Sequence, residues 1–140
     1  MKSEFPLYIL SLFFLFSACD KTADPANPID KKLIGHWINP TYNADFSVIT
    51  FTRVSDFGEI EYGVAFKENQ LFIERKNATG CGTPPITYGN FEGIWSSTDS
   101  TLSISVENWN GTTDYQWRVT SLDHQNLTIE VLDTEHHWEE

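Results

Sequence analysis

Cys81 is the residue whose type and surroundings most directly suggest covalent chemistry. It stands between two glycines, which leaves its thiol open enough to act as a nucleophile. A nucleophilic thiol needs a neighbouring base, and none of the four histidines stands at a spacing that brings it to Cys81. The sequence therefore favours a buried or half-buried structural thiol, because unpaired cysteines commonly pack as small apolar side chains.

Metal-ligating residue types gather at the carboxyl end, in the run Glu135-His136-His137-Trp138-Glu139-Glu140. Adjacent side chains of a strand point to opposite faces, so the two histidines cannot bind one ion unless the segment is irregular. We expect a solvated tail that holds no metal. The sequence also has no phosphate loop, dinucleotide fingerprint or paired-carboxylate signature, and we expect no enzymatic activity and no cofactor.

Cys19 carries the most specific chemical signal. Residues 5–18 contain no charge, are mostly apolar and follow a short positive region at Lys2. A membrane-spanning helix needs about 20 apolar residues, so this shorter run is typical of a signal peptide. The run ends in Phe16-Ser17-Ala18-Cys19 and then turns polar. Two small residues before a cysteine at this place resemble the lipobox of bacterial lipoproteins.

The lipobox resemblance implies that the chain is cut before Cys19, that the Cys19 sulfur carries a diacylglycerol and that the new amino terminus is acylated. Three acyl chains would anchor the protein permanently, since each buried methylene contributes about 0.8 kcal/mol. The polar start after Cys19 resembles lipoproteins of the Bacteroidota, and we expect the cell envelope, at either face of the outer membrane. An ordinary secretory leader with an accidental cysteine is the alternative.

The charge balance limits the partners of this chain. Nine Lys and Arg against 20 Asp and Glu give a net charge of −11, which argues against nucleic-acid binding and against a basic membrane-binding patch. With Cys19 lipidated, Cys81 has no partner for an intramolecular disulfide, so stability must come from a hydrophobic core. We assign residues 1–18 to the signal peptide, 19–30 to a lipidated tether and 31–140 to one domain.

The pattern of the domain predicts an all-β fold. Its later segments alternate apolar and polar residues, which indicates strands with one buried face. Short polar turns favour antiparallel neighbours, and eight such strands can close into a barrel without edges. The predicted strands are Leu33–Asn39, Phe46–Val54, Glu59–Lys67, Leu71–Lys76, Tyr88–Ser96, Thr101–Glu107, Thr112–Leu122 and Leu127–Leu132.

Two similar tripeptides suggest a weak internal repeat. Gly35-His36-Trp37 opens the first predicted strand, and Gly93-Ile94-Trp95 recurs in the fifth. Between the halves, residues 77–87 hold Cys81 and the pair Pro84-Pro85, which cannot lie inside a ladder and so mark a connection. We expect structural roles for Gly35, Trp37, Gly93, Trp95 and Cys81.

Leu33-Ile34-Gly35-His36-Trp37, eight short strands and a lipoprotein leader together resemble the small lipocalin-like lipoproteins of Gram-negative bacteria. The resemblance covers about residues 33–132 and implies an eight-stranded antiparallel up-and-down barrel with Trp37 packed across its closed end. Thr113-Asp114-Tyr115 also matches the second motif of true lipocalins. Lipocalins place an arginine late in the barrel over this tryptophan; here the eighth predicted strand has none, and Arg118 lies in the seventh.

Two function classes remain open. The first is a membrane-anchored barrel that binds a small hydrophobic ligand at the mouth opposite Trp37. The second is a protein-interaction module with a filled barrel, such as an inhibitor, an immunity protein or a surface-complex component. An eight-stranded barrel is just wide enough to be filled by its own side chains or to hold one small ligand. The inward candidates for a ligand pocket are Tyr115, Trp117, Leu102, Ile104 and Val106.

Overall fold

The computed structural model of the chain describes residues 28–79 and 81–140. Cys19, the predicted signal peptide and most of the predicted tether lie outside these residues. A short helix, α1 (Pro28–Leu33), begins inside the segment expected to be a tether, with Pro28 at a first helical position that suits proline. In the described part of the chain, no helix is long and apolar enough to cross a membrane.

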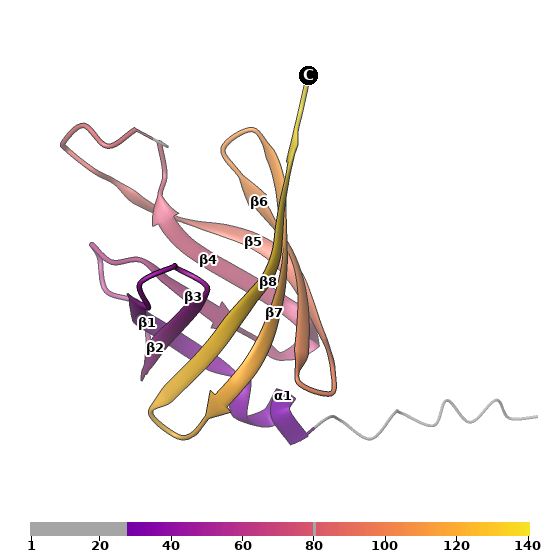
Figure 1. Cartoon of the computed structure of the whole chain (residues 1–140). Coiled ribbons are helices and arrows are strands. Elements are labelled where there is room, and N and C mark those ends of the chain that lie inside the picture. Colours follow the sequence, from indigo (N-terminus) through magenta and orange to yellow (C-terminus); the bar gives the residue numbers. More distant parts are fainter. Residues whose placement is uncertain (1–27, 80) are drawn as a thin grey trace, which may run out of the picture.

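Eight strands follow α1 in the described residues, and they close into one antiparallel barrel (Figure 1). This is the all-β, eight-stranded barrel that the alternation of residues predicted. From β3 to β8 each strand pairs with the next, and β2 closes the wall by pairing with β8. The strands are β1 (Gly35–Tyr42), β2 (Val48–Val54), β3 (Gly63–Phe66), β4 (Leu71–Asn77), β5 (Tyr88–Thr98), β6 (Thr101–Asn108), β7 (Gly111–Leu122) and β8 (Asn126–Trp138).

The strand order differs from a simple up-and-down barrel at one place, because β1 lies between β2 and β3. Trp37 is opposite Arg53 of β2 on one side and Val64 of β3 on the other. β2 and β3 therefore run parallel, and residues 55–62 cross β1 instead of forming a hairpin. Phe57 of this crossover packs edge-on against His36, with ring centroids 4.8 Å apart. The third strand is accordingly shorter than predicted, because the first residues of the predicted strand belong to the crossover.

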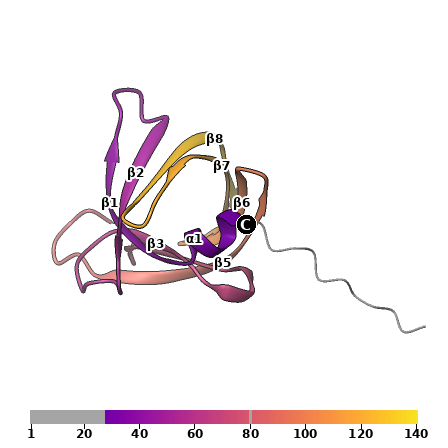
Figure 2. The same ribbon diagram turned by 90° about the horizontal axis from the view of Figure 1, so that it is seen from below.

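One end of the barrel is closed by α1, which lies across the opening in the view of Figure 2. Leu33 and Trp37 are completely buried there, and the Trp37 indole Nε1 donates a hydrogen bond of 2.9 Å to the Leu33 carbonyl. Trp37 thus packs across the closed end, where the family resemblance placed it.

Arg53 of β2 covers Trp37 from outside. Its guanidinium lies 4.0 Å from the centroid of the Trp37 ring and donates a 2.8 Å hydrogen bond to the Ile34 carbonyl. Arg118 instead lies on the outer surface, where it pairs with Glu130 at 2.8 Å. The covering arginine therefore comes from β2, the strand that neighbours β8 in the barrel wall.

Two glycines permit close approaches in this frame. Gly35 has a φ of +143°, and the Arg53 guanidinium occupies the place where a side chain would stand. At Gly93 the backbone of the neighbouring β6 comes so near that no Cβ fits. Trp95, two residues further on, is 5 % exposed and its Nε1 donates to the Lys67 carbonyl at 3.2 Å.

Aromatic side chains fill the closed half of the barrel. Phe72 contacts Phe66 and Trp117 edge-on, with ring centroids 5.2 and 6.3 Å apart. Phe51 also packs against Trp117, with ring centroids 6.4 Å apart. All four rings are at most 3 % exposed. Because protein interiors of this kind are close-packed, this half of the barrel is a core and not a ligand cavity.

Candidate functional site

The open end of the barrel, opposite α1, contains a pocket of about 310 Å³. In Figure 1 the turn between β6 and β7 and the end of β8 stand at this end, at the top of the view. Strands β4, β6, β7 and β8, this turn and the end of the crossover supply the lining. The lining residues are Tyr62, Glu74, Lys76, Asn77, Asn108, Trp109, Thr113, Tyr115, His136 and Trp138.

The floor of this mouth pocket is an ion pair. Glu74 and Lys76 are two residues apart on β4, so their side chains lie on the same face of the strand, which is the face inside the barrel. They are 3 % and 9 % exposed, and Lys76 Nζ lies 2.7 Å from Glu74 Oε2. Charged side chains are rarely buried unless they are paired, and this pair satisfies that condition.

Two phenols complete the surroundings of the carboxylate. Tyr62 and Tyr115 donate hydrogen bonds of 2.9 and 3.3 Å from their hydroxyls to Glu74 Oε1. Burial, followed by the negative charge of Glu74, raises the pKa of both phenols well above the usual value of 10. Both therefore remain protonated donors to Glu74 at neutral pH.

Aromatic rings form the wall beside Lys76. The ammonium lies 4.7 Å from the centroid of Phe91 and 5.0 Å from that of Trp109, close enough for cation–π attraction. Trp109 Nε1 donates to the Asn77 carbonyl at 2.7 Å, which fixes the indole at the rim. Trp109 lines the pocket and is nevertheless 49 % exposed, so about half of its surface remains accessible to solvent.

The wall on the other side is the end of β8: the residues after Leu132 are exposed, as expected of a solvated tail, but they continue the strand to Trp138. β7 is long enough to pair with β8 as far as Trp138, opposite Gly111. His136 Nδ1 lies 2.9 Å from Thr113 Oγ1, whereas His137 Nε2 lies 3.0 Å from Asp114 Oδ2 on the outer face. The adjacent histidines thus have separate partners. Over residues 28–79 and 81–140, no three His, Cys, Asp or Glu gather in a way that could hold a metal.

The sequence-predicted pocket candidates separate into two groups. Tyr115 lines the mouth pocket. Trp117, Leu102, Ile104 and Val106 do not line it and are at most 3 % exposed within the packed core. The residues that sequence reasoning missed are the floor pair and the rim, namely Glu74, Lys76, Tyr62, Trp109, His136 and Trp138.

Cys81 is exposed, which contradicts the expectation of a buried or half-buried thiol. The loop between β4 and β5 offers few apolar side chains that could cover it, since residues 81–85 are Cys-Gly-Thr-Pro-Pro. The thiol lies 3.4 Å from Thr83 Oγ1, and its hydrogen bonds with Thr83 lower the pKa of Cys81.

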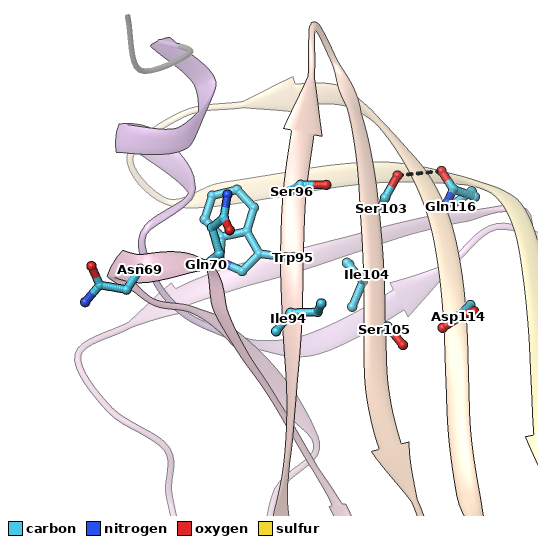
Figure 3. Close-up of a pocket in the computed structure, with 10 residues that line it drawn as sticks. All are labelled: Asn69, Gln70, Ile94, Trp95, Ser96, Ser103, Ile104, Ser105, Asp114 and Gln116. Carbon is cyan, nitrogen blue, oxygen red and sulfur yellow. Dashed lines mark hydrogen bonds between the residues drawn. The ribbon is translucent and has the colours of Figure 1, made fainter. Parts of the chain in front are cut away.

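A second concavity, of about 360 Å³, runs over β5, β6 and β7 (Figure 3). Ser96, Ser103 and Gln116 form one row across the three strands, with a 3.0 Å hydrogen bond from Ser103 to Gln116. None of its polar side chains is buried. The mouth pocket, with its buried charges, is therefore the better candidate site.

Comparisons of the chain with protein-family models, with curated proteins and with solved structures give no match in any of the three. The functional inference therefore rests on the geometry of the mouth pocket, because a barrel alone does not define a function.

Proposed function

We propose that the protein is a lipid-anchored envelope protein whose barrel binds a small molecule in the mouth pocket. The observation that carries this proposal is the buried Glu74–Lys76 pair at the pocket floor. Burying two charges is expensive, and replacing such a pair with apolar residues is often neutral or stabilising. A barrel that needed only a filled core would be served by apolar residues here, so the polar floor favours recognition of a ligand.

The size of the pocket limits the ligand. A volume of about 310 Å³ is at the lower end of the range of roughly 300–1,000 Å³ for small-molecule sites. The packed rings of Phe72 and Trp117 block deeper entry. The ligand is therefore a compact molecule with an apolar body, held against Trp109 and Trp138 at the rim, and not a long chain threaded through the barrel.

The position of α1 supports access to the mouth from outside. α1 lies at the closed end (Figure 2), and a chain that leads from a lipidated Cys19 reaches the barrel through α1. The mouth then opens at the opposite end, away from the anchoring membrane. This arrangement suits capture of a molecule from the surrounding medium.

Tryptophan fluorescence of the Cys19→Ser protein, titrated with fatty acids, retinoids, haem and small aromatic compounds, tests the binding function. We expect a saturable change with the compact aromatic compounds. Trp109→Leu should weaken this binding by about tenfold, as loss of a well-packed aromatic contact does. Arg118→Gln, on the outer surface, is the control. Absence of any saturable change in the whole panel would refute ligand binding.

Membrane fractionation tests the anchor separately. Cys19→Ser should move the protein from the membrane fraction to the soluble fraction and abolish fatty-acid labelling, because the sulfur is the attachment point. If the wild-type protein carries no lipid and fractionates as the variant does, the anchor proposal is wrong while the binding proposal is unaffected.

One observation favours the interaction-module alternative. Tyr42 ends β1, and Phe46 lies in the turn that leads to β2. Their side chains are 48 % and 69 % exposed, and their ring centroids are 5.7 Å apart. Exposed aromatic pairs are typical of protein interfaces. If the alternative holds, Phe46→Ser abolishes crosslinking to one defined envelope protein and leaves the fluorescence titration unchanged.

A further inference from the structure

We infer that the mouth pocket selects an uncharged ligand that presents a hydrogen-bond acceptor, such as a carbonyl oxygen, beside an aromatic or alicyclic body. This inference rests on the proposed binding function and names the ligand class for the same site. Some hydrogen-bonding groups of the pocket already have partners within the protein, and others do not; the inference follows from this difference.

The carboxylate of the floor is already occupied. Glu74 Oε1 accepts from Tyr62 and Tyr115, and Oε2 accepts from Lys76. Three donors on one carboxylate use most of its lone-pair sites. A donor group of a ligand, such as an ammonium, would have to displace one of these three partners.

Lys76, in contrast, has donors to spare. An ammonium carries three N–H groups, and one of them is on Glu74. Within the described residues the others meet no oxygen or nitrogen, and the group faces the rings of Phe91 and Trp109. A ring face is a weak acceptor, so a ligand oxygen beside Lys76 would gain a charge-assisted hydrogen bond.

A relay of side chains can give the pocket a second donor. Asn108 Nδ2 donates to Thr113 Oγ1 at 3.0 Å, and this hydroxyl also lies 2.9 Å from His136 Nδ1. A hydroxyl that accepts from Asn108 can either donate to Nδ1 or accept from it. In the tautomer in which Thr113 donates, the ring proton of His136 sits on Nε2, and Nε2 has no hydrogen-bond partner in the part of the chain that the structure describes.

The rim provides surface for the body of the ligand. Trp109 and Trp138 both line the pocket and are 49 % and 62 % exposed. Trp138 stacks on His136 with ring centroids 5.7 Å apart. A planar or alicyclic body that covers these indoles buries apolar surface that water otherwise reaches.

Charge argues for an uncharged head group. Lys76 is already neutralised by Glu74, so the floor offers donors without a net positive charge. The chain as a whole carries −11, and a field of that sign lowers the local concentration of anions. A carbonyl oxygen uses the free donors without this penalty.

Four probes that share a naphthalene ring and differ in their head group test the inference. They are naphthamide, naphthoate, naphthylmethylamine and methylnaphthalene, each titrated against the Cys19→Ser protein. We expect naphthamide to bind about tenfold more tightly than methylnaphthalene, as one charge-assisted hydrogen bond allows. Naphthylmethylamine should bind no better than the hydrocarbon, and naphthoate less tightly than the amide. Trp109→Leu should weaken all probes that bind, which places them in the mouth pocket.

Variants then identify the donors. Glu74→Leu/Lys76→Met removes both charges together, so neither is left buried alone, and it should reduce the preference for the amide. His136→Phe keeps the stacking on Trp138 and should reduce that preference, whereas His137→Phe, on the outer face, should leave it unchanged. Equal or tighter binding of the hydrocarbon or the amine, or an amide preference that is unchanged in both pocket variants, would overturn the inference and leave the binding function intact. If none of the four probes binds, the inference fails, and the binding function is then decided by the wider panel of fatty acids, retinoids, haem and small aromatic compounds.

Discussion

Glu74 and Lys76 are second neighbours on β4, and their side chains meet inside the barrel with Nζ 2.7 Å from Oε2. A strand turns every second side chain to the same face, so this spacing makes both charges internal at once. Neither charge is acceptable there without the other, because an uncompensated buried charge is strongly destabilising. The two residues therefore behave as one unit, and changes to them should be strongly non-additive.

A double-mutant cycle measures this unit. Glu74→Leu leaves Lys76 buried without its counter-charge and should lower the free energy of unfolding by about 3–5 kcal/mol. Glu74→Leu/Lys76→Met should be neutral or more stable than the wild type by about 1–4 kcal/mol. Urea denaturation gives the values. A double variant that loses the sum of the two single losses would show that the side chains act independently.

The sequence does not show which side chains of β4 point into the barrel. Leu71, Phe72 and Ile73 are three consecutive apolar residues, so alternation does not show which parity points inward. The structure places Phe72 inside at 0 % exposure and leaves Leu71 36 % exposed, which carries Glu74 and Lys76 inward. β6 presents the opposite case, since Leu102, Ile104 and Val106 alternate with polar residues and are buried as predicted.

The position of β1 between β2 and β3 was also beyond the sequence pattern. Turn length predicts a hairpin only where the connection is short, and residues 55–62 are long enough to pair or to cross. In the structure they cross, and Phe57 packs against His36, a contact between segments that have no periodic relation. The same limit applied to Arg53, whose role over Trp37 depends on β1 and β2 being neighbours.

Arg53 should contribute to stability through Trp37. Arg53→Met removes the cation–π contact and the hydrogen bond to the Ile34 carbonyl, and we expect a loss of about 1–3 kcal/mol. Arg118→Met, at the exposed pair with Glu130, is the matched control and should change stability by less than about 1 kcal/mol. Thermal unfolding of both variants distinguishes them, and equal effects would contradict the covering role of Arg53.

Trp37 itself should be a principal element of the core. Trp37→Ala removes a completely buried indole and its hydrogen bond to the Leu33 carbonyl. We expect a loss of about 3–5 kcal/mol, because a large buried ring leaves a cavity that the barrel cannot close. Urea unfolding followed by circular dichroism measures it. Trp138→Ala, at a 62 % exposed indole, should lose far less, and comparable losses would place Trp37 outside the core.

Cys81 should react readily in the folded protein. Its exposure and its lowered pKa both favour the thiolate that attacks thiol reagents. In a Cys19→Ser background, native protein should label as fast as, or faster than, protein unfolded in urea. Thr83→Val removes the hydroxyl that lowers the pKa and should slow labelling near neutral pH. Slow labelling of the native protein that speeds up only on unfolding would restore the buried-thiol interpretation.

The phenols around Glu74 should respond to its charge at alkaline pH. Burial and then the Glu74 carboxylate raise the pKa of Tyr115 and Tyr62 in the folded protein, whereas in the unfolded chain these groups ionise near 10. Above that pH the unfolded chain loses protons that the folded barrel retains, so stability is unaffected below 10 and falls as the pH rises further.

Glu74→Gln removes the charge while it keeps the shape of the side chain, so it should lower the pKa of Tyr115 towards 10. Phenolate absorbance of the folded protein, followed in an alkaline titration, measures the change. Tyr115→Phe identifies the group that moves, and Glu107→Gln, an exposed carboxylate on β6, controls for the loss of a charge elsewhere. If the titration of Glu74→Gln superimposes on that of the wild type, the carboxylate does not act on Tyr115, and the hydrogen-bond network at the pocket floor is wrong.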